Sequence, residues 1–379
     1  TMGDFPGNKD KILSFYREAV EKGADLIVFP EMVITGYPPQ DLLLERDFVQ
    51  KNVEILEDIS NQVTVPAVLG CIRKEKSALY NSGAVCTNGA VVYTCDKILL
   101  PTYDIFYEER YFTPGKTPGV FELELNGSRR KIGIQICEDL WDHDYGCKVT
   151  NLQRSAGAEV IINISASPYH DGQLQERTAL IKEKVHENGI PFLYCNMVGA
   201  QDELIFDGES LVFSANGDCL GQGAAFKEDL FLVDLEASSP IEIKVQPREE
   251  KMFRALCLGV SDYFKKTGHT EAVLGLSGGI DSALVATIAA DALGPNHVHG
   301  ISLPSKYSSD HSLSDAQALA GKLGIDFRII PIQEAVEGLE TILHPHFVGL
   351  EPNVTEENIQ ARARGNLLMA LSNKFAWMV

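Results

Sequence analysis

Residues Val273–Ala286, VLGLSGGIDSALVA, place a small glycine-rich turn between an apolar run and an alanine-rich run. This order predicts a short strand, a tight turn and a helix in immediate succession. Glycines let the backbone N–H groups of such a turn approach a phosphate, and the N-terminus of the following helix adds a positive electrostatic end. The stretch therefore predicts a phosphate-binding loop.

The predicted loop lacks the lysine of the common Walker loop, GxxxxGK[ST], in which lysine reaches the outer phosphates. Its sequence GLSGGIDS ends instead in Asp281 and Ser282, and Asp281 can hold Mg²⁺ through an oxygen ligand. This suits a loop that grips the β,γ-pyrophosphate of ATP as a leaving group, whereas the alternative is a turn that uses glycine for geometry alone. The candidate ATP-binding residues are Gly275, Leu276, Ser277, Gly278, Gly279, Ile280, Asp281 and Ser282.

The residues around this loop alternate between strand-like and helix-like patterns. An amphipathic helix is expected over 251–268. Strands alternating with helices at this spacing indicate a doubly wound parallel sheet. Strands are expected at 271–279, 297–305 and 326–332, and helices at 282–294, 315–324 and 356–374.

The first two-thirds of the chain predicts a layered α/β domain with a mixed sheet. Asn88-Gly89 lies between two β-rich runs, which is a strong hairpin signal. Strands are expected at 24–31, 65–72, 82–97, 131–137, 159–165, 191–198 and 209–223, and helices at 8–22, 41–59, 148–156 and 174–188. The polar stretch 235–250 favours a boundary, so we expect domains at 1–240 and 251–379 and a linker at 241–250.

Composition narrows the possible partners and the compartment. With 379 residues and 45% hydrophobic composition, the chain can bury two cores. A formal net charge of −20 disfavours nucleic acid and anionic membrane as partners. The cysteines form no CxxC pair, so their scatter indicates a reducing, cytoplasmic compartment rather than a zinc site. Both ends lie inside apparent secondary-structure patterns, so we expect a piece of a longer protein, truncated at both ends.

Three polar residues follow predicted strands of the first domain, where loops commonly build sites. Cys137 ends one strand, and Glu31 and Lys97 follow two others. Taken singly, they would be a buried structural cysteine, a surface carboxylate and a solvated lysine. Taken together, they are the parts of an amide hydrolase in which the glutamate accepts the thiol proton and the lysine stabilises the oxyanion.

Four segments around these residues resemble the nitrilase superfamily, and more closely the glutaminase domain of the glutamine-dependent NAD synthetases. They are VFPEMVITGYPPQDLL (28–43), KILLPTYDIFYEERYF (97–112), IGIQICEDLW (132–141) and NISASPYH (163–170). The resemblance implies an α-β-β-α sandwich with Glu31, Lys97 and Cys137 as the catalytic triad. It also implies glutamine contacts at Tyr103, Ser167 and Gln173, and the family usually has lysine where this chain has Gln173.

The SGGIDS loop resembles that of the N-type ATP pyrophosphatases, which include the synthetase domain of the same family. This implies a Rossmann-like domain in which ATP yields AMP and pyrophosphate. The segment ISLPSKYSS (301–309) is similar to a loop that closes over ATP, and NIQAR (358–362) to a pattern whose asparagine, here Asn358, binds deamido-NAD. The resemblance thus implies glutamine, ATP, Mg²⁺ and deamido-NAD as ligands, NAD synthesis as the reaction, and a homo-oligomer.

Three other hypotheses fit parts of these patterns. A nitrilase-type amidase regulated by a nucleotide-sensing domain would never form AMP and pyrophosphate. A second kind of glutamine-using ligase, for example one that makes GMP, would share the SGGIDS loop but not the Glu–Lys–Cys domain. A scaffold without catalytic activity would explain neither the residues at the strand ends nor the phosphate loop.

Overall fold

The computed structural model describes residues 1–125, 127–306 and 310–379, with the backbone alone described at Asp310. The chain forms two compact units, Thr1–Lys251 and Met252–Val379. Their boundary falls within one helix, α5 (Arg248–Thr267). Within the described ranges, none of the helices combines the length and the apolar character needed to cross a bilayer.

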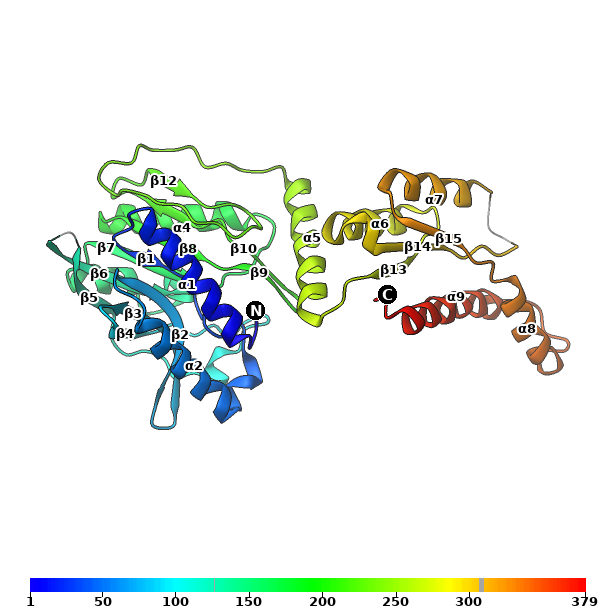
Figure 1. Cartoon of the computed structure of the whole chain (residues 1–379), viewed down its shortest axis with the longest axis horizontal. Coiled ribbons are helices and arrows are strands. Elements are labelled where there is room, and N and C mark those ends of the chain that lie inside the picture. Colours follow the sequence, from blue (N-terminus) through cyan, green and yellow to red (C-terminus); the bar gives the residue numbers. More distant parts are fainter. Residues whose placement is uncertain (126, 307–309) are drawn as a thin grey trace. The chain divides into compact units, whose positions relative to one another are not determined.

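The first unit contains two large sheets (Figure 1). One has the strand order β1-β2-β3-β4, with bounds Ile27–Val28, Ala67–Glu75, Ala78–Thr87 and Ala90–Asp96. The other has the order β12-β11-β8-β7-β6-β5, with bounds Cys219–Gln222, Leu211–Phe213, Phe192–Asn196, Val160–Ser165, Ser128–Ile136 and Gly119–Leu125. A separate hairpin joins β9 (Val198–Gln201) to β10 (Leu204–Asp207).

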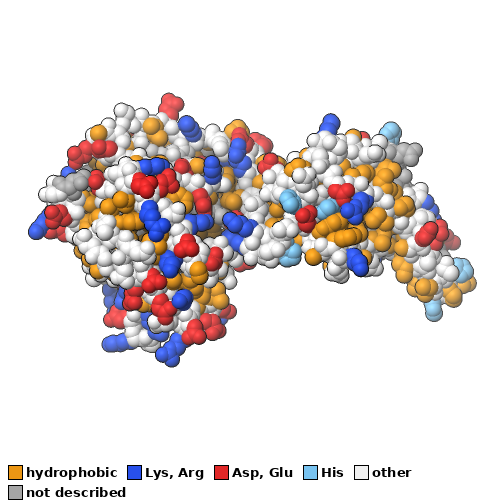
Figure 2. Space-filling view, viewed as in Figure 1, with side chains coloured by type: hydrophobic (Ala, Val, Ile, Leu, Met, Phe, Trp, Pro, Cys, Tyr) orange, Lys and Arg blue, Asp and Glu red, His pale blue; other side chains and the backbone are white. Residues whose placement is uncertain are grey.

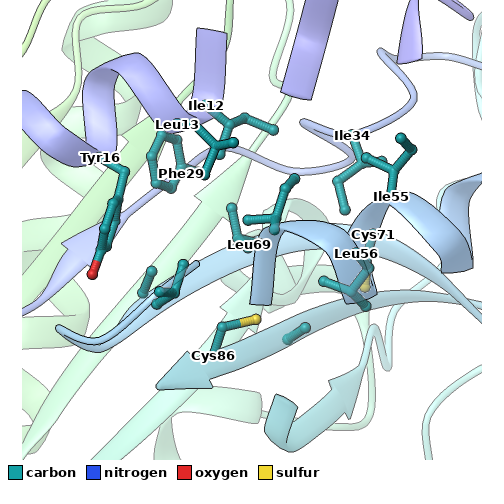
Figure 3. Packing of buried hydrophobic residues seen from close by; sticks show 14 of the residues in the cluster. Ile12, Leu13, Tyr16, Phe29, Ile34, Ile55, Leu56, Leu69, Cys71 and Cys86 are labelled. Carbon is teal, nitrogen blue, oxygen red and sulfur yellow. The ribbon is translucent and has the colours of Figure 1, made fainter. Parts of the chain in front are cut away.

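Helices cover the outer face of each sheet, and apolar side chains fill the space between the sheets. Figure 3 shows side chains of α1 (Phe5–Glu21) and α2 (Arg46–Ser60) packed on the first sheet around Leu69. On the second sheet, α3 (Val149–Ser155) packs on β6, and α4 (Gln173–Asn188) contributes to the core on its outer face. Val68, next to Leu69, instead faces Ile134 and Ile164 of the second sheet. Alternation along the strands thus builds the α-β-β-α sandwich that the resemblance implied.

The predicted Asn-Gly hairpin is confirmed as the β3–β4 connection. Thr87 pairs with Ala90, and Asn88 and Gly89 both have positive φ, 50° and 79°. A two-residue turn with positive φ at both positions matches the twist of the flanking strands, and asparagine and glycine tolerate that conformation best.

Several predicted elements of the first unit differ from the observed ones. The strand expected over 24–31 is only Ile27–Val28. The chain stays beside β2 as far as Pro30, whose carbonyl oxygen accepts from the Gly70 N–H at 3.2 Å, but proline has no N–H with which to continue the ladder. The edge strand β5 and the β9–β10 hairpin were not predicted. Both are short or half-exposed, so they lack a long apolar run.

The second unit has a parallel sheet in the order β13-β14-β15, with bounds Ala272–Gly275, Val298–Ser302 and Asp326–Ile329. Ala272 also pairs in parallel with Met378 on the opposite side of β13. The chain therefore adds β14 and β15 on one side of β13 and the bridge at Met378 on the other, so the order reverses at β13, as in a doubly wound sheet. The accompanying helices are α6 (Ile280–Leu293), α7 (Asp310–Leu323), α8 (Gln333–Leu343) and α9 (Val354–Phe375), of which α8 was not predicted.

Candidate active sites

Glu31 and Lys97 form a buried ion pair in the first unit. The Lys97 Nζ lies 3.0 Å from Glu31 Oε1 and 2.9 Å from Oε1 of a second glutamate, Glu108. Glu31 also accepts hydrogen bonds from Asn81 Nδ2 at 2.6 Å and from the backbone N–H of Ala166 at 2.8 Å. Burial alone would lower the pKa of Lys97, but the charges of Glu108 and Glu31 raise it well above its usual value. Lys97 is therefore a fixed cation between two carboxyl groups.

Cys137 lies directly after β6, at the start of a short 3₁₀ turn (Cys137–Leu140). Its φ of 43° is unusual for a residue other than glycine, and such strain is often found at functional positions. Burial and the nearby Glu31 raise the pKa of its thiol well above the usual value, and Lys97 opposes the rise. The resting thiol is therefore protonated, so a base must remove its proton before it attacks.

Two acidic residues next to Cys137 have different roles in the geometry. Asp139 is buried and accepts hydrogen bonds from the backbone N–H groups of Ile98, Leu99 and Ile136 at 2.9–3.0 Å. It thereby joins the segment after Lys97 to the residue before Cys137. Glu138 is also buried, and its two oxygens accept from the hydroxyls of Tyr103 and Tyr145, each at 2.9 Å.

The three predicted glutamine contacts lie in two places. Tyr103 is half-exposed and donates to Glu138, whereas Ser167 and Gln173 are buried. The Gln173 Nε2 donates to Ser167 Oγ at 2.9 Å, and its Oε1 has no hydrogen-bond partner. Ser167 follows Ala166, whose N–H donates to Glu31, so the Ser167 loop is attached directly to Glu31.

Glu108 and Tyr37 belong to this cluster although the sequence did not single them out. The Tyr37 hydroxyl donates to Glu108 Oε1 at 2.8 Å, and Glu108 Oε2 has no partner. Burial raises the pKa of Glu108, and Lys97 opposes that rise. The one available signal was a pair of carboxylates inside the aromatic run DIFYEERYF, because acidic residues among aromatics can be buried.

The predicted phosphate-binding loop of the second unit connects β13 to α6, where the strand order of the sheet reverses. Ligands of open α/β sheets bind beyond the carboxyl ends of the strands at such a switch point. The Ser277 and Ser282 hydroxyls lie 3.1 Å apart, and Ser282 Oγ donates to the carbonyl oxygen of Gly279. Gly278 has φ 79°, and a Cβ there would lie 2.3 Å from the Ser312 carbonyl oxygen. Both features require glycine.

The remaining candidates of the second unit lie at the start of α6 and on α9. Asp281 is exposed in the first turn of α6. Asn358 is exposed on α9, and Arg364 of the same helix donates to the carbonyl oxygen of Leu303, just after β14. The predicted ATP-covering segment includes residues 307–309, which lie outside the described residues.

Family models match both units separately. Residues 1–244 match the carbon–nitrogen hydrolase family, and residues 252–379 match the NAD synthase family. An amidase of the nitrilase superfamily from Nesterenkonia covers 59% of this chain at 23% identity with a TM-score of 0.51, which shows the fold of the first unit alone. The two units together define a class of enzyme in which an amide hydrolase is joined to a nucleotide-using ligase.

Three relatives match along nearly the whole chain. The glutamine-dependent NAD(+) synthetases of Thermotoga maritima and Synechocystis are 40% and 39% identical over 100% of this chain, which spans 72% and 71% of their lengths. The structure of the glutamine-dependent NAD⁺ synthetase from Acinetobacter baumannii in complex with ADP is 34% identical, with a TM-score of 0.93 over 99% of this chain and 71% of that one. The chain belongs to the glutamine-dependent NAD(+) synthetase family.

Proposed function

We propose that Cys137, Glu31 and Lys97 hydrolyse glutamine, and that residues 275–282 bind the ATP used for NAD synthesis. The observation that carries the first assignment is the buried cation of Lys97 between Glu31 and Glu108, beside a thiol whose pKa is raised. A protonated nucleophile, a carboxylate base and a fixed cation are the groups that amide hydrolysis needs.

In the proposed first half-reaction, Glu31 takes the thiol proton as the Cys137 sulfur attacks the amide carbon of glutamine. Lys97 stabilises the negative oxygen that forms. Glu31 then returns the proton to the leaving nitrogen, so ammonia departs and a thioester remains. Glu31 next takes a proton from water, which attacks the thioester; glutamate leaves and the thiol is restored.

We propose that Tyr103, Ser167 and Gln173 hold the glutamine. Ser167 and Gln173 are buried and already joined, and the unpartnered Gln173 Oε1 retains hydrogen-bonding capacity. As a neutral side chain, Gln173 would bind a carboxylate through its amide N–H group without adding charge.

In the proposed second half-reaction, the carboxylate of deamido-NAD attacks the α-phosphate of ATP, giving an acyl adenylate and pyrophosphate. Ammonia then displaces AMP and leaves the amide of NAD. The glycine-rich loop supports this assignment because its backbone and hydroxyls can hold a pyrophosphate leaving group. Asn358 is the proposed deamido-NAD contact, and its place on the same helix as Arg364 is compatible with that role.

Asp281 is the proposed Mg²⁺ ligand. Among the residues that the structure describes, no group of three or more His, Cys, Asp or Glu side chains could hold a metal ion. One exposed carboxylate at a helix start fits a cation that arrives on nucleotide phosphates, because Mg²⁺ commonly takes one or two carboxylates and completes its shell with phosphate oxygens and water. The cation would neutralise phosphate charge, and Asp281 would position it.

We propose a domain division at 1–240 and 251–379 with a linker at 241–250, supported by family matches that end at 244 and begin at 252. We also propose a cytoplasmic homo-oligomer. All eight cysteines are free, which supports a reducing compartment. The oligomer rests on the family resemblance.

The test follows NAD formation from deamido-NAD, ATP and Mg²⁺ in wild type and Cys137→Ala, with glutamine or ammonium as the nitrogen source. We expect the variant to lose glutamine-driven synthesis by at least about a thousandfold, since nucleophile loss removes the covalent route, and to keep ammonium-driven synthesis. Cys147→Ala is the matched control, because Cys147 is a free, half-buried thiol outside the triad cluster.

Two outcomes would overturn parts of this proposal. Normal glutamine-driven synthesis by Cys137→Ala would exclude Cys137 as the nucleophile. Glutamine hydrolysis without any formation of AMP and pyrophosphate from ATP would favour the nucleotide-regulated amidase.

A further inference from the structure

Four charged side chains lie buried next to the Ser167 loop. Arg177, Asp207, Glu209 and Lys251 are each more than nine-tenths buried. Arg177 Nη2 lies 3.1 Å from Asp207 Oδ1, and Lys251 Nζ lies 2.6 Å from Glu209 Oε2. Burial and the neighbouring Asp207 raise the pKa of Glu209, whereas Lys251 lowers it, so the two ion pairs form one group.

Asn196 joins this group to the backbone of Ser167. Its Oδ1 accepts from the Ser167 N–H at 2.9 Å, and its Nδ2 donates to the Ser167 carbonyl oxygen at 3.2 Å. The same Nδ2 donates to Asp207 Oδ1 at 2.9 Å. One amide side chain therefore holds both backbone groups of Ser167, and its orientation depends on Asp207.

A second set of contacts reaches the same loop from the first turn of α5. The Lys251 ammonium lies 5.7 Å from the ring centroid of Tyr169, two residues after Ser167. Arg248, at the start of α5, forms an ion pair with Asp171 at 2.6 Å. The first turn of α5 therefore contacts the Ser167 loop both through the buried network and at the surface.

Stability alone explains this network poorly. Desolvating ions offsets most of their attraction, and apolar replacements of a buried ion pair are often neutral or stabilising. Removing one partner is different, because it leaves an uncompensated charge in the interior. Without Lys251, Glu209 would stand unpaired beside Asp207, and the carboxylate that orients Asn196 would lose its fixed position.

We propose that Lys251 is a positioning residue for the glutamine site: by neutralising Glu209 it keeps Asp207, Asn196 and the backbone of Ser167 in the arrangement that binds substrate. The inference rests on the proposed role of Ser167 in binding glutamine. Lys251 lies in the first turn of α5, so it also attaches this turn to the glutamine-binding loop.

The test measures glutamate formation by the whole chain as a function of glutamine concentration. For Lys251→Met we expect the KM for glutamine to rise at least about tenfold, with kcat changed less than about threefold, because the reacting groups are untouched. The double variant Lys251→Met/Glu209→Gln removes both charges and leaves an amide that can donate to Asp207. It should return the KM to within about threefold of wild type. A purely structural role would lower the melting temperature without this rescue.

Lys265→Met is the matched control, because Lys265 is exposed on the same helix. A wild-type KM in folded Lys251→Met, or a KM defect that the double variant retains, would overturn the proposal. If Lys251→Met does not fold, the KM for glutamine is compared between wild type, Lys251→Arg and the double variant. A raised KM in the double variant then overturns the proposal. Cys137→Ala separates the two proposals. If this variant hydrolyses glutamine normally, the proposed function fails. If it is inactive and Lys251→Met is unaffected, only the positioning role of Lys251 is refuted.

Discussion

Asp139 connects the segments that carry the proposed catalytic residues Lys97 and Cys137, so its protonation state affects their geometry. Its carboxylate accepts three backbone N–H groups, two after Lys97 and one before Cys137. Burial raises the pKa of this carboxyl to about 7, against the hydrogen bonds that lower it. Below that pH the acid carries a proton, which turns one acceptor into a donor facing other donors.

We therefore expect the kcat/KM for glutamine to rise with pH through an apparent pKa near 7. Asp139→Asn should lower activity at pH 8 by about ten- to a hundredfold, since small displacements of catalytic groups are costly. The same variant should also flatten the part of the rise of kcat/KM with pH that Asp139 causes. A pH–rate profile of both proteins checks this, and an unchanged acid limb in an otherwise impaired variant would assign the limb to another group.

The raised pKa of Asp139 also affects folding stability, and there the protonated form is the favoured one. A carboxyl whose folded pKa is raised favours folding fully below the unfolded value, about 4, and loses that contribution as pH rises to about 7. Asp139 thus contributes least to stability at the pH where its charged form holds the site together.

Among the elements, the β13–α6 loop depends most on backbone conformation. Gly278 combines a positive φ of 79° with close contact to the Ser312 carbonyl oxygen. We expect Gly278→Ala to raise the Kd for ATP by at least about tenfold, because the loop must move and a non-glycine residue in this region costs about 1–2 kcal/mol. Isothermal titration with ATP and Mg²⁺ measures the change.

Gly321→Ala is the matched control for that loop variant. Gly321 lies in α7, and a Cβ there would meet no atom within 4 Å. Its replacement should leave ATP binding unchanged and stabilise the helix by up to about 1 kcal/mol. Equal ATP affinities for Gly278→Ala and wild type would mean that the loop does not hold the nucleotide.

At the scale of the whole molecule, each hydrophobic cluster of the described residues lies within one unit. On the face shown in Figure 2, acidic and basic side chains of residues 1–251 lie intermixed, without a continuous basic surface. This mixture agrees with the formal net charge of −20.

Separate cores predict separate unfolding transitions. Ile301 is fully buried in the second unit, so Ile301→Ala should destabilise that unit by about 2–5 kcal/mol. We expect calorimetry to show one transition shifted down, with glutamine hydrolysis retained below it. Ile342→Ala, at a 69% exposed position, is the control. A matching downward shift of every transition would show that the chain unfolds as one unit.

The fold class of each unit was predictable from the sequence, and the sequence also pointed to the candidate site residues, because both signals depend on local order. Short segments carry periodicity and backbone conformation. These two signals explain why the sequence predicted the apolar strands, the Asn88-Gly89 turn and the glycine-rich loop. The positions of Glu31, Lys97 and Cys137 after strands were visible for the same reason. Short or half-exposed elements, such as β1, β5 and α8, were missed or overextended because neighbouring layers decide where they end.

Which charged side chains meet depends on the packed fold and could not be predicted from the sequence. Glu108 lies eleven residues after Lys97, a separation that gives no sign that their side chains touch. Lys251 and Glu209 are forty-two residues apart, and either would be expected at the surface from its type alone. Ion pairs between distant segments exist only after the sheets and loops have packed, so their partners are set by the folded arrangement rather than by spacing along the chain.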